Sequence, residues 1–183
     1  MTQSQSEQGG RAAALRHALL GVRARYDLLS RGQTASLRRC RTADEVALEG
    51  IFWRVAGDLG RDERHLAQVV LLFPLATQTN RAQFSFGRYL RHSLPEGDGA
   101  TLRFRRLLDS RDRDELGHRL RGILRLAARS QGTVDWGVLG VDILWFFAES
   151  DSVRRRWAQD FYAPQAESAL KTAARSAASD SVP

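Results

Sequence analysis

At 183 residues, the chain is long enough for one domain, or for two small lobes, to fold around a hydrophobic core without disulfides or metals. A hydrophobic share of 43% and a charged share of 27% are typical of a folded globular protein, so a largely disordered chain is excluded. The 28 basic residues, all arginine except Lys171, exceed the 21 acidic residues and give a net charge of +7, which favours an anionic partner.

The first predicted helix follows a polar start of the chain. Residues 1–10 show no periodic pattern and are expected to form a disordered tail. From Arg11 onward, apolar residues recur at steps of 4, 3, 4 and 3, which is the spacing of one helix face: Leu15, Leu19, Val22, Tyr26 and Leu29. Ser30 to Gly32 should end this helix.

The next segments are short and basic, then apolar. Residues 35–41 read ASLRRCR and are expected to form a single helical turn that carries Arg38 and Arg39. Thr42 and Glu45 have the spacing of a capping box, which predicts a helix over residues 43–56. A third helix should follow Asp62 and stop at Pro74.

The sequence LPEGDGA at residues 94–100 is the clearest linker in the chain. We therefore expect an elongated, all-α protein with an N-terminal helical lobe at 11–93 and a C-terminal helical lobe at 101–163. The first lobe would end with the short helix SFGRYLRHS, which carries Arg88 and Arg91. An Ala/Ser-rich tail would occupy residues 164–183. No segment alternates with the period of a strand.

The segment from Arg103 to Arg129 combines an apolar stripe with a row of arginines. Asp112 and Glu115 predict the start of a helix whose core face lies within one arc of about 100°: Leu116, Leu120, Ile123, Leu124 and Ala127. Arg119 falls on one flank of this helix. The other flank carries three arginines that have no acid four residues away: Arg121, Arg125 and Arg129. We expect this second flank to bind phosphate groups.

The C-terminal lobe should contain two more helices. Thr133 or Asp135 would cap a helix that is apolar nearly all round and should lie at the centre of the lobe. Ser152 begins a last helix, which buries Val153, Trp157 and Phe161 and carries Arg154, Arg155 and Arg156.

No motif in the sequence points to an enzyme. The four histidines lie in separate segments without metal-ligand spacing, and no phosphate-binding loop or nucleophile elbow is present. Cys40, flanked by arginines, could be reactive, but a buried bystander thiol is favoured. Asp135 and Asp142 share a helix face, yet a cap and an ion pair explain them better than a catalytic pair. We expect no catalytic residue, no metal and no cofactor.

Cellular location can also be predicted. The single cysteine excludes an internal disulfide, no run approaches 18 apolar residues, and the N-terminus lacks an apolar signal segment. The sequence therefore predicts a cytoplasmic protein with no membrane association.

The arginines cluster in four places: Arg23 to Arg41, Arg88 with Arg91, the segment just described, and Arg154 to Arg156. A GC-rich genome would raise the arginine share, but it would not explain this clustering. Such a surface reads the charge and shape of a nucleic-acid backbone, so binding without sequence preference is expected.

Six short motifs follow one another along the chain: LRR at 37–39, SFGRYL at 85–90, RF-x-x-LL at 103–108, DRDEL-x-x-RLR at 112–121, DW at 135–136 and RRRWAQDFY at 154–162. In order and spacing they resemble the CasB small subunit of the type I-E CRISPR Cascade complex, and the resemblance covers roughly residues 11–163. Each is a short helix fragment, and their joint order carries the resemblance. Both ends of the chain depart from the family pattern.

The resemblance implies a non-enzymatic helical subunit of a CRISPR RNA-guided complex for antiviral defence. Its partners would be the guide RNA, both strands of the target DNA in the R-loop, the backbone and large Cascade subunits, and a second copy of itself. The nucleic-acid-binding residues that the motifs and the helix spacing together indicate are Arg38, Arg39, Arg88, Arg113, Arg119, Arg121, Arg125, Arg154 and Arg155.

Two other functions fit an arginine-rich helical protein. A helical adaptor would use its arginines to bind acidic partner proteins. A helix-turn-helix regulator would need Asn, Gln or Ser among the arginines of its recognition helix, and the helix that follows Asp112 has none of these before Ser130.

Overall fold

The computed structural model of the chain describes residues 2–57, 63–78, 85–95, 97–128, 133–148 and 151–163, with side chains from residue 9 onward. Within these ranges the structure is helical apart from one short strand pair, which confirms the all-α prediction. The helices are α1 (Thr2–Asp27), α2 (Arg31–Arg39), α3 (Ala43–Leu48), α4 (Gly50–Ala56), α5 (Glu63–Leu72), α6 (Phe86–Ser93), α7 (Asp98–Leu108), α8 (Arg113–Ala127), α9 (Trp136–Trp145) and α10 (Ser152–Tyr162).

Short polar side chains set the starts of several helices by accepting hydrogen bonds from the first-turn backbone N–H groups, which have no partner within the helix. These caps are Ser30 for α2, Thr42 for α3, Ser85 for α6, Asp112 for α8 and Asp135 for α9. Ser30 belongs to a full capping box with Gln33. The basic segment is therefore a helix of nine residues, longer than the single turn expected.

Helix α1 begins at Thr2, so it includes residues 2–10, which were expected to be a disordered tail. Extending an existing helix costs little, because each added residue gains one hydrogen bond without a new nucleus. The stretch contains no proline to stop that extension. The expected tail at 164–183 lies outside the described residues.

The helix predicted over residues 43–56 is broken at Glu49, which has an extended backbone and separates α3 from α4. The break allows both helices to bury apolar side chains: Val46 from α3 and Phe52 and Val55 from α4. The single helix predicted from Thr42 and Glu45 is therefore two helices, and the apolar spacing of the sequence does not mark the break between them.

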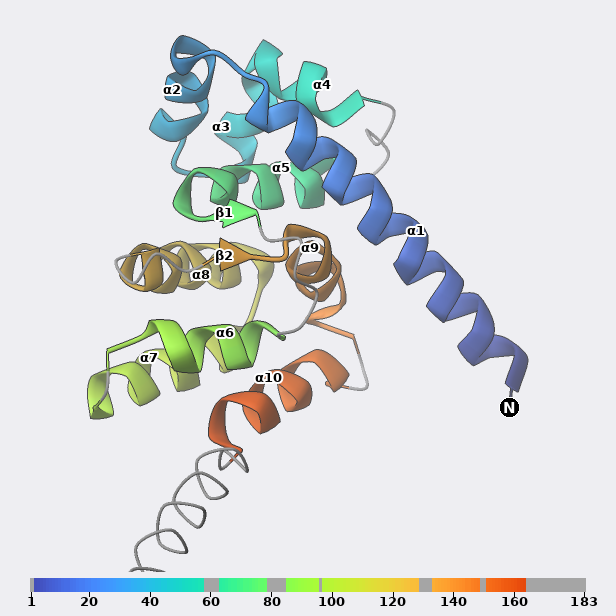
Figure 1. Cartoon of the computed structure of the whole chain (residues 1–183), viewed down its shortest axis with the longest axis vertical. Coiled ribbons are helices and arrows are strands. Elements are labelled where there is room, and N and C mark those ends of the chain that lie inside the picture. Colours follow the sequence, from blue (N-terminus) through green and yellow to red (C-terminus); the bar gives the residue numbers. More distant parts are fainter. Residues whose placement is uncertain are drawn as a thin grey trace, which may run out of the picture.

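The helices form two groups with a shared centre (Figure 1). Helices α2 to α5 lie at one end, α6, α7 and α10 lie at the other, and α8 and α9 lie between them. Helix α1 packs along α9, and α6 packs on α10, although α1 and α6 both precede the predicted linker at 94–100. Helix α6 therefore belongs with the second group, and α7 already begins at Asp98.

A parallel strand pair joins the two groups at their centre. After α5, a 3-10 turn (Phe73–Leu75) leads into β1 (Thr77–Gln78), which pairs with β2 (Thr133–Val134). Strands of two residues leave no alternating pattern, so they could not be seen in the sequence. The buried hydrophobic side chains of the described residues form one cluster that spans both groups.

None of the helices in the described part of the chain combines the length and the apolar character needed to cross a lipid bilayer.

Candidate nucleic-acid interface

Helix α8 fixes the candidate interface because its buried face decides where its arginines lie. Leu116, Leu120, Ile123, Leu124 and Ala127 are all buried, as the helix spacing predicts. The two flanks of α8 then face different neighbours. The Arg119 side chain reaches α7, whereas the Arg121 side chain reaches the end of α2.

Arg121 holds the end of α2 in place. Its Nη1 atom donates hydrogen bonds to the carbonyl oxygens of Cys40 at 2.9 Å and Arg41 at 3.1 Å. Its Nε atom is buried without a hydrogen-bond partner in the described part of the chain. Burial lowers the pKa of Arg121, and the positive charge of Arg125 adds to that shift. Arg121 therefore positions the end of α2, and its predicted contact with phosphate would be an additional role.

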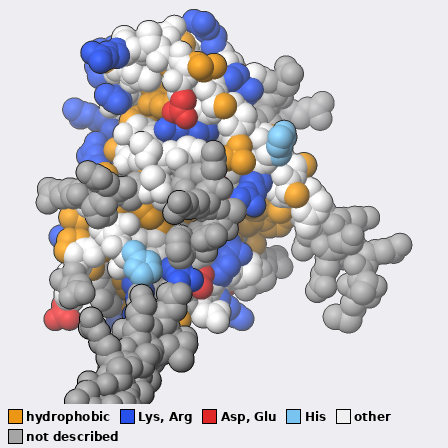
Figure 2. Space-filling view, viewed as in Figure 1, with side chains coloured by type: hydrophobic (Ala, Val, Ile, Leu, Met, Phe, Trp, Pro, Cys, Tyr) orange, Lys and Arg blue, Asp and Glu red, His pale blue; other side chains and the backbone are white. Residues whose placement is uncertain are grey.

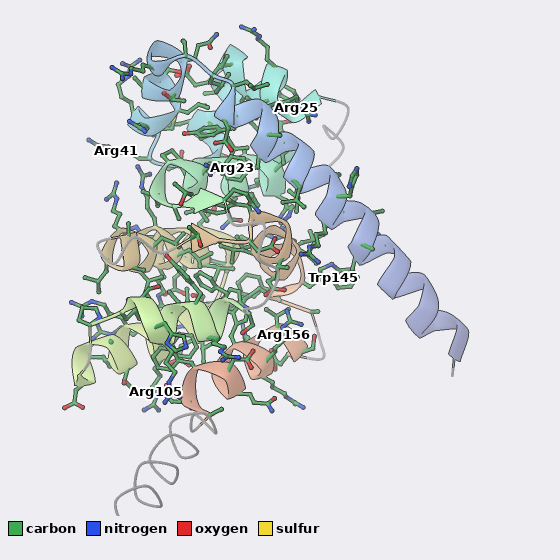
Figure 3. The ribbon with its side chains drawn as sticks, in the orientation of Figure 1. Arg23, Arg25, Arg41, Arg105, Trp145 and Arg156 are labelled. Carbon is green, nitrogen blue, oxygen red and sulfur yellow. The ribbon has the colours of Figure 1, made fainter. Side chains whose placement is uncertain are left out.

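We use the name α2–α8 surface for the arginines that this contact brings together: Arg38, Arg39, Arg41, Arg121 and Arg125. All but Arg121 are exposed. Among the described residues, none of these exposed guanidinium groups has an acidic ion-pair partner. Figure 2 shows basic side chains along the side of the molecule formed by α2, and Figure 3 shows Arg41 there. Arg41 was not among the predicted site residues, although it lies in the same basic segment.

Arg119 and Arg154 are predicted site residues that the fold already uses. The Arg119 guanidinium pairs with Glu115 and donates to the carbonyl oxygen of Arg106. The Arg154 guanidinium donates to the carbonyl oxygen of Ser110 at 2.9 Å. It also lies 4.8 Å from the centre of the Phe146 ring, a cation–π distance.

The remaining predicted site residues lie apart from one another. Arg113 is exposed in the first turn of α8, and its carbonyl oxygen accepts a hydrogen bond from Gln68. Arg88 is exposed on α6, and Arg155 is exposed on α10. The structure therefore concentrates its arginines at the α2–α8 surface and distributes the others over the second group of helices. Arg129 lies outside the described residues.

Two arginines from the predicted patch at residues 23–41 are bound to the main chain. Arg23 is buried, pairs with Asp27 at 2.8 Å and donates to the carbonyl oxygen of Phe73 at 2.9 Å. Arg25 donates to the carbonyl oxygen of Val55 at 2.7 Å. The patch is therefore smaller than the sequence suggested, since helix spacing cannot show contacts with distant carbonyl groups.

The residues considered for catalysis have structural partners. Asp135 caps α9 and pairs with Arg16 at 2.7 Å, and Asp142 pairs with Arg156, as expected for these two acids. Burial raises the pKa of the Cys40 thiol, which opposes the formation of a reactive thiolate. No cluster of three or more metal-ligating side chains occurs among the residues that the structure describes.

Comparisons with known proteins agree with this architecture. The family model described as CRISPR-associated protein Cse2 matches residues 33–162. The crystal structure of CasB from Thermobifida fusca is similar, with a TM-score of 0.59 and 21% sequence identity over 83% of this chain and 97% of that chain. At that identity the similarity concerns the fold. No curated protein sequence matches the chain.

Proposed function

Because the chain belongs to the CRISPR-associated Cse2 family, we propose that it is a non-catalytic small subunit of a CRISPR RNA-guided Cascade complex for antiviral defence. In that complex it binds nucleic-acid backbone through its arginine-rich surface and stabilises the R-loop formed by guide RNA, target strand and displaced strand. Its protein partners are the backbone and large subunits and a second copy of itself.

The α2–α8 surface is the observation that carries this proposal. Four exposed guanidinium groups, three from the end of α2 and the residues after it and one from α8, have no acidic ion-pair partner in the described part of the chain. Arginine binds phosphate oxygens in a bidentate manner, so such a group of side chains favours a polyanion over an isolated carboxylate. Contacts to phosphate oxygens carry no sequence information, so binding through the backbone should be independent of sequence.

Modest contacts are sufficient for the proposed role. Opening a DNA duplex while pairing one strand with RNA is close to balanced in free energy, so a few backbone contacts can shift the equilibrium. Each phosphate that an arginine neutralises adds about 0.7 to 0.9 to the slope of log affinity against log salt. The α2–α8 surface supplies contacts of this kind without any chemical step.

Reconstituted complex tests the proposal. We expect the double variant Arg39→Ala, Arg125→Ala to weaken R-loop formation on target DNA by about tenfold at near-physiological salt. The matched control is Arg11→Ala, Arg54→Ala, which removes the same charge from exposed positions on α1 and α4. If the control weakened R-loop formation equally, the effect would come from the lower net charge and not from the α2–α8 surface.

A protein-adaptor function would give a different result. If the α2–α8 variant formed R-loops normally but no longer remained with the partner proteins after nuclease treatment, the surface would bind protein and the proposal would be wrong. Arg121→Ala gives a further distinction. Arg121→Ala should lower both R-loop formation and the unfolding temperature of the isolated chain, because Arg121 binds the carbonyl groups at the end of α2. Arg125→Ala should lower R-loop formation and leave the unfolding temperature unchanged.

A further inference from the structure

A hollow of about 620 Å³ opens between α1, α2, the 3-10 turn and the end of α8. Its lining comes from these segments and from β1, and it includes Tyr26, Thr34, Arg38, Thr77 and Ala128. The volume is in the range of about 300 to 1,000 Å³ that is typical of small-molecule sites. Arg38 belongs both to this hollow and to the α2–α8 surface, so the hollow lies at the border of the proposed nucleic-acid interface.

The charges inside the hollow nearly cancel. Arg23 and Asp27 both line it, and they form an ion pair with each other at 2.8 Å. Arg23 is also fixed by the carbonyl oxygens of Phe73 at 2.9 Å and Ala76 at 3.1 Å. Figure 3 shows Arg23 below α1, beside β1. Among the described residues that line the hollow, the charge left to attract an anion is therefore that of Arg38, which is exposed.

Apolar and polar groups share the wall. Pro74 and Leu75, which are half-buried, supply apolar surface, whereas Phe73 behind them is almost fully buried. The hydroxyl group of Tyr26 is buried beside the Arg38 side chain, which interacts with it outside normal hydrogen-bond geometry. A ligand that supplies a hydrogen-bond partner of better geometry stabilises such a hydroxyl. The hollow thus offers apolar surface, a buried hydroxyl and an exposed cation at its entrance.

We propose that this hollow binds one unpaired nucleotide of a single strand, with its phosphate on Arg38 and its base against Pro74 and Leu75. Duplex DNA does not fit this arrangement, because a base within a duplex is paired and stacked and must be taken out of the stack to enter a pocket. The inference rests on the proposed function, since the α2–α8 surface would bring the strand to the entrance. Single-stranded DNA and RNA share the required chemistry.

Binding of short oligonucleotides to the full chain tests the proposal. Fluorescence anisotropy would compare a labelled single strand of about ten nucleotides with strands in which one base at a time is removed to leave an abasic site. Base stacking in single-strand binding proteins typically accounts for a five- to more than hundredfold change in affinity. We expect removal of the base at one position, and not at its neighbours, to weaken binding by about tenfold. The same series in RNA and in DNA identifies which strand is preferred.

Two variants connect this loss to the hollow. Thr34→Phe should reduce affinity for the intact strand and abolish the difference between the intact and abasic strands, because its ring occupies the space of the base. Gly32→Phe is the matched control on the same helix, at an exposed position where an added Cβ meets no atom within 4 Å. Tyr26→Phe should weaken binding of the intact strand but not of the abasic strand.

Each outcome supports or overturns the proposal. Suppose that the Arg39→Ala, Arg125→Ala variant binds oligonucleotides more weakly, but that neither an abasic site at any position nor Thr34→Phe changes the affinity. The hollow is then not a nucleotide site, and the proposed function stands. If the chain binds no oligonucleotide even at low salt, both proposals fail. If an oligo-glutamate peptide competes for binding in a manner that Thr34→Phe abolishes, the hollow takes an acidic peptide instead.

Discussion

Asp142 shows how a single buried charge is held in this protein. Its side chain is almost fully buried in α9, and it accepts hydrogen bonds from Trp157 Nε1 at 2.7 Å and from the Arg156 guanidinium. Burial raises the pKa of the carboxyl group, and the charge of Arg156 offsets only part of that rise. The folded state therefore binds the proton more tightly than the unfolded state does.

The raised pKa of Asp142 makes the stability of the folded chain depend on pH. The favourable contribution of Asp142 is complete below its ordinary pKa of 3.8 and is lost as the pH rises through the raised value. Asp142→Asn keeps an acceptor for Trp157 but cannot ionise. We predict that the wild-type chain loses unfolding free energy relative to Asp142→Asn as the pH rises above about 4, as measured by urea denaturation. Parallel pH profiles for the two proteins would contradict this.

Sequence spacing predicted which face each arginine occupies, but not what its guanidinium contacts. The prediction that α8 carries Arg119 on one flank and Arg121 on the other is confirmed by their contacts with α7 and α2. The partners of Arg121 are carbonyl groups about 80 residues away in the chain. Such contacts depend on how helices pack, and no local pattern encodes them.

At the scale of elements, the contact between α6 and α10 depends on a glycine. Gly87 lies in the first turn of α6, where a Cβ atom would come within 2.2 Å of the carbonyl oxygen of Trp157 in α10. The motif SFGRYL thus contains a packing residue beside its arginine. Gly122 on α8 provides a contrast, since a Cβ there would meet no atom within 4 Å.

We predict that Gly87→Ala lowers the unfolding free energy by about 2 to 3 kcal/mol, because the backbones of α6 and α10 must separate. Gly122→Ala should raise it by roughly 0.5 to 1 kcal/mol, since alanine stabilises a helix interior relative to glycine. Urea denaturation of both variants provides the measurement. A small effect of Gly87→Ala would mean that α6 and α10 can move apart freely.

Most helices could be predicted because their caps and apolar spacing are local signals. Asp112 and Asp135 cap their helices as expected, and α10 begins at Ser152. The break at Glu49 was not predictable, because the apolar spacing continues across it and only tertiary packing rewards the bend. The linker at 94–100 has the composition of a domain boundary, but Leu94 and Ala100 at its two ends are buried in the shared core.

At the scale of the whole molecule, one core connects the two groups of helices. The buried cluster includes Leu19 from α1, Leu90 from α6 and Trp157 from α10, and the strand pair ties residues 77–78 to residues 133–134. Composition predicted a folded basic protein, and the order of motifs predicted the family that the family model supports. The arrangement of the helices around a shared centre required long-range contacts that the sequence does not display.

We predict that the isolated chain unfolds in a single cooperative transition, because neither group of helices has a core of its own. Circular dichroism at 222 nm and tryptophan fluorescence should give coincident urea curves, and the calorimetric and van't Hoff enthalpies should agree. Two separate transitions would instead indicate that the groups fold independently on either side of residues 94–100.

The salt dependence of target binding by the reconstituted complex tests the central claim most directly. If Arg39 and Arg125 bind phosphate groups, their replacement by alanine should reduce the slope of log affinity against log salt by about 1.5, and the Arg11→Ala, Arg54→Ala control should keep the wild-type slope. Identical slopes for the wild-type and the Arg39→Ala, Arg125→Ala complex would contradict the assignment of the α2–α8 surface as a nucleic-acid interface.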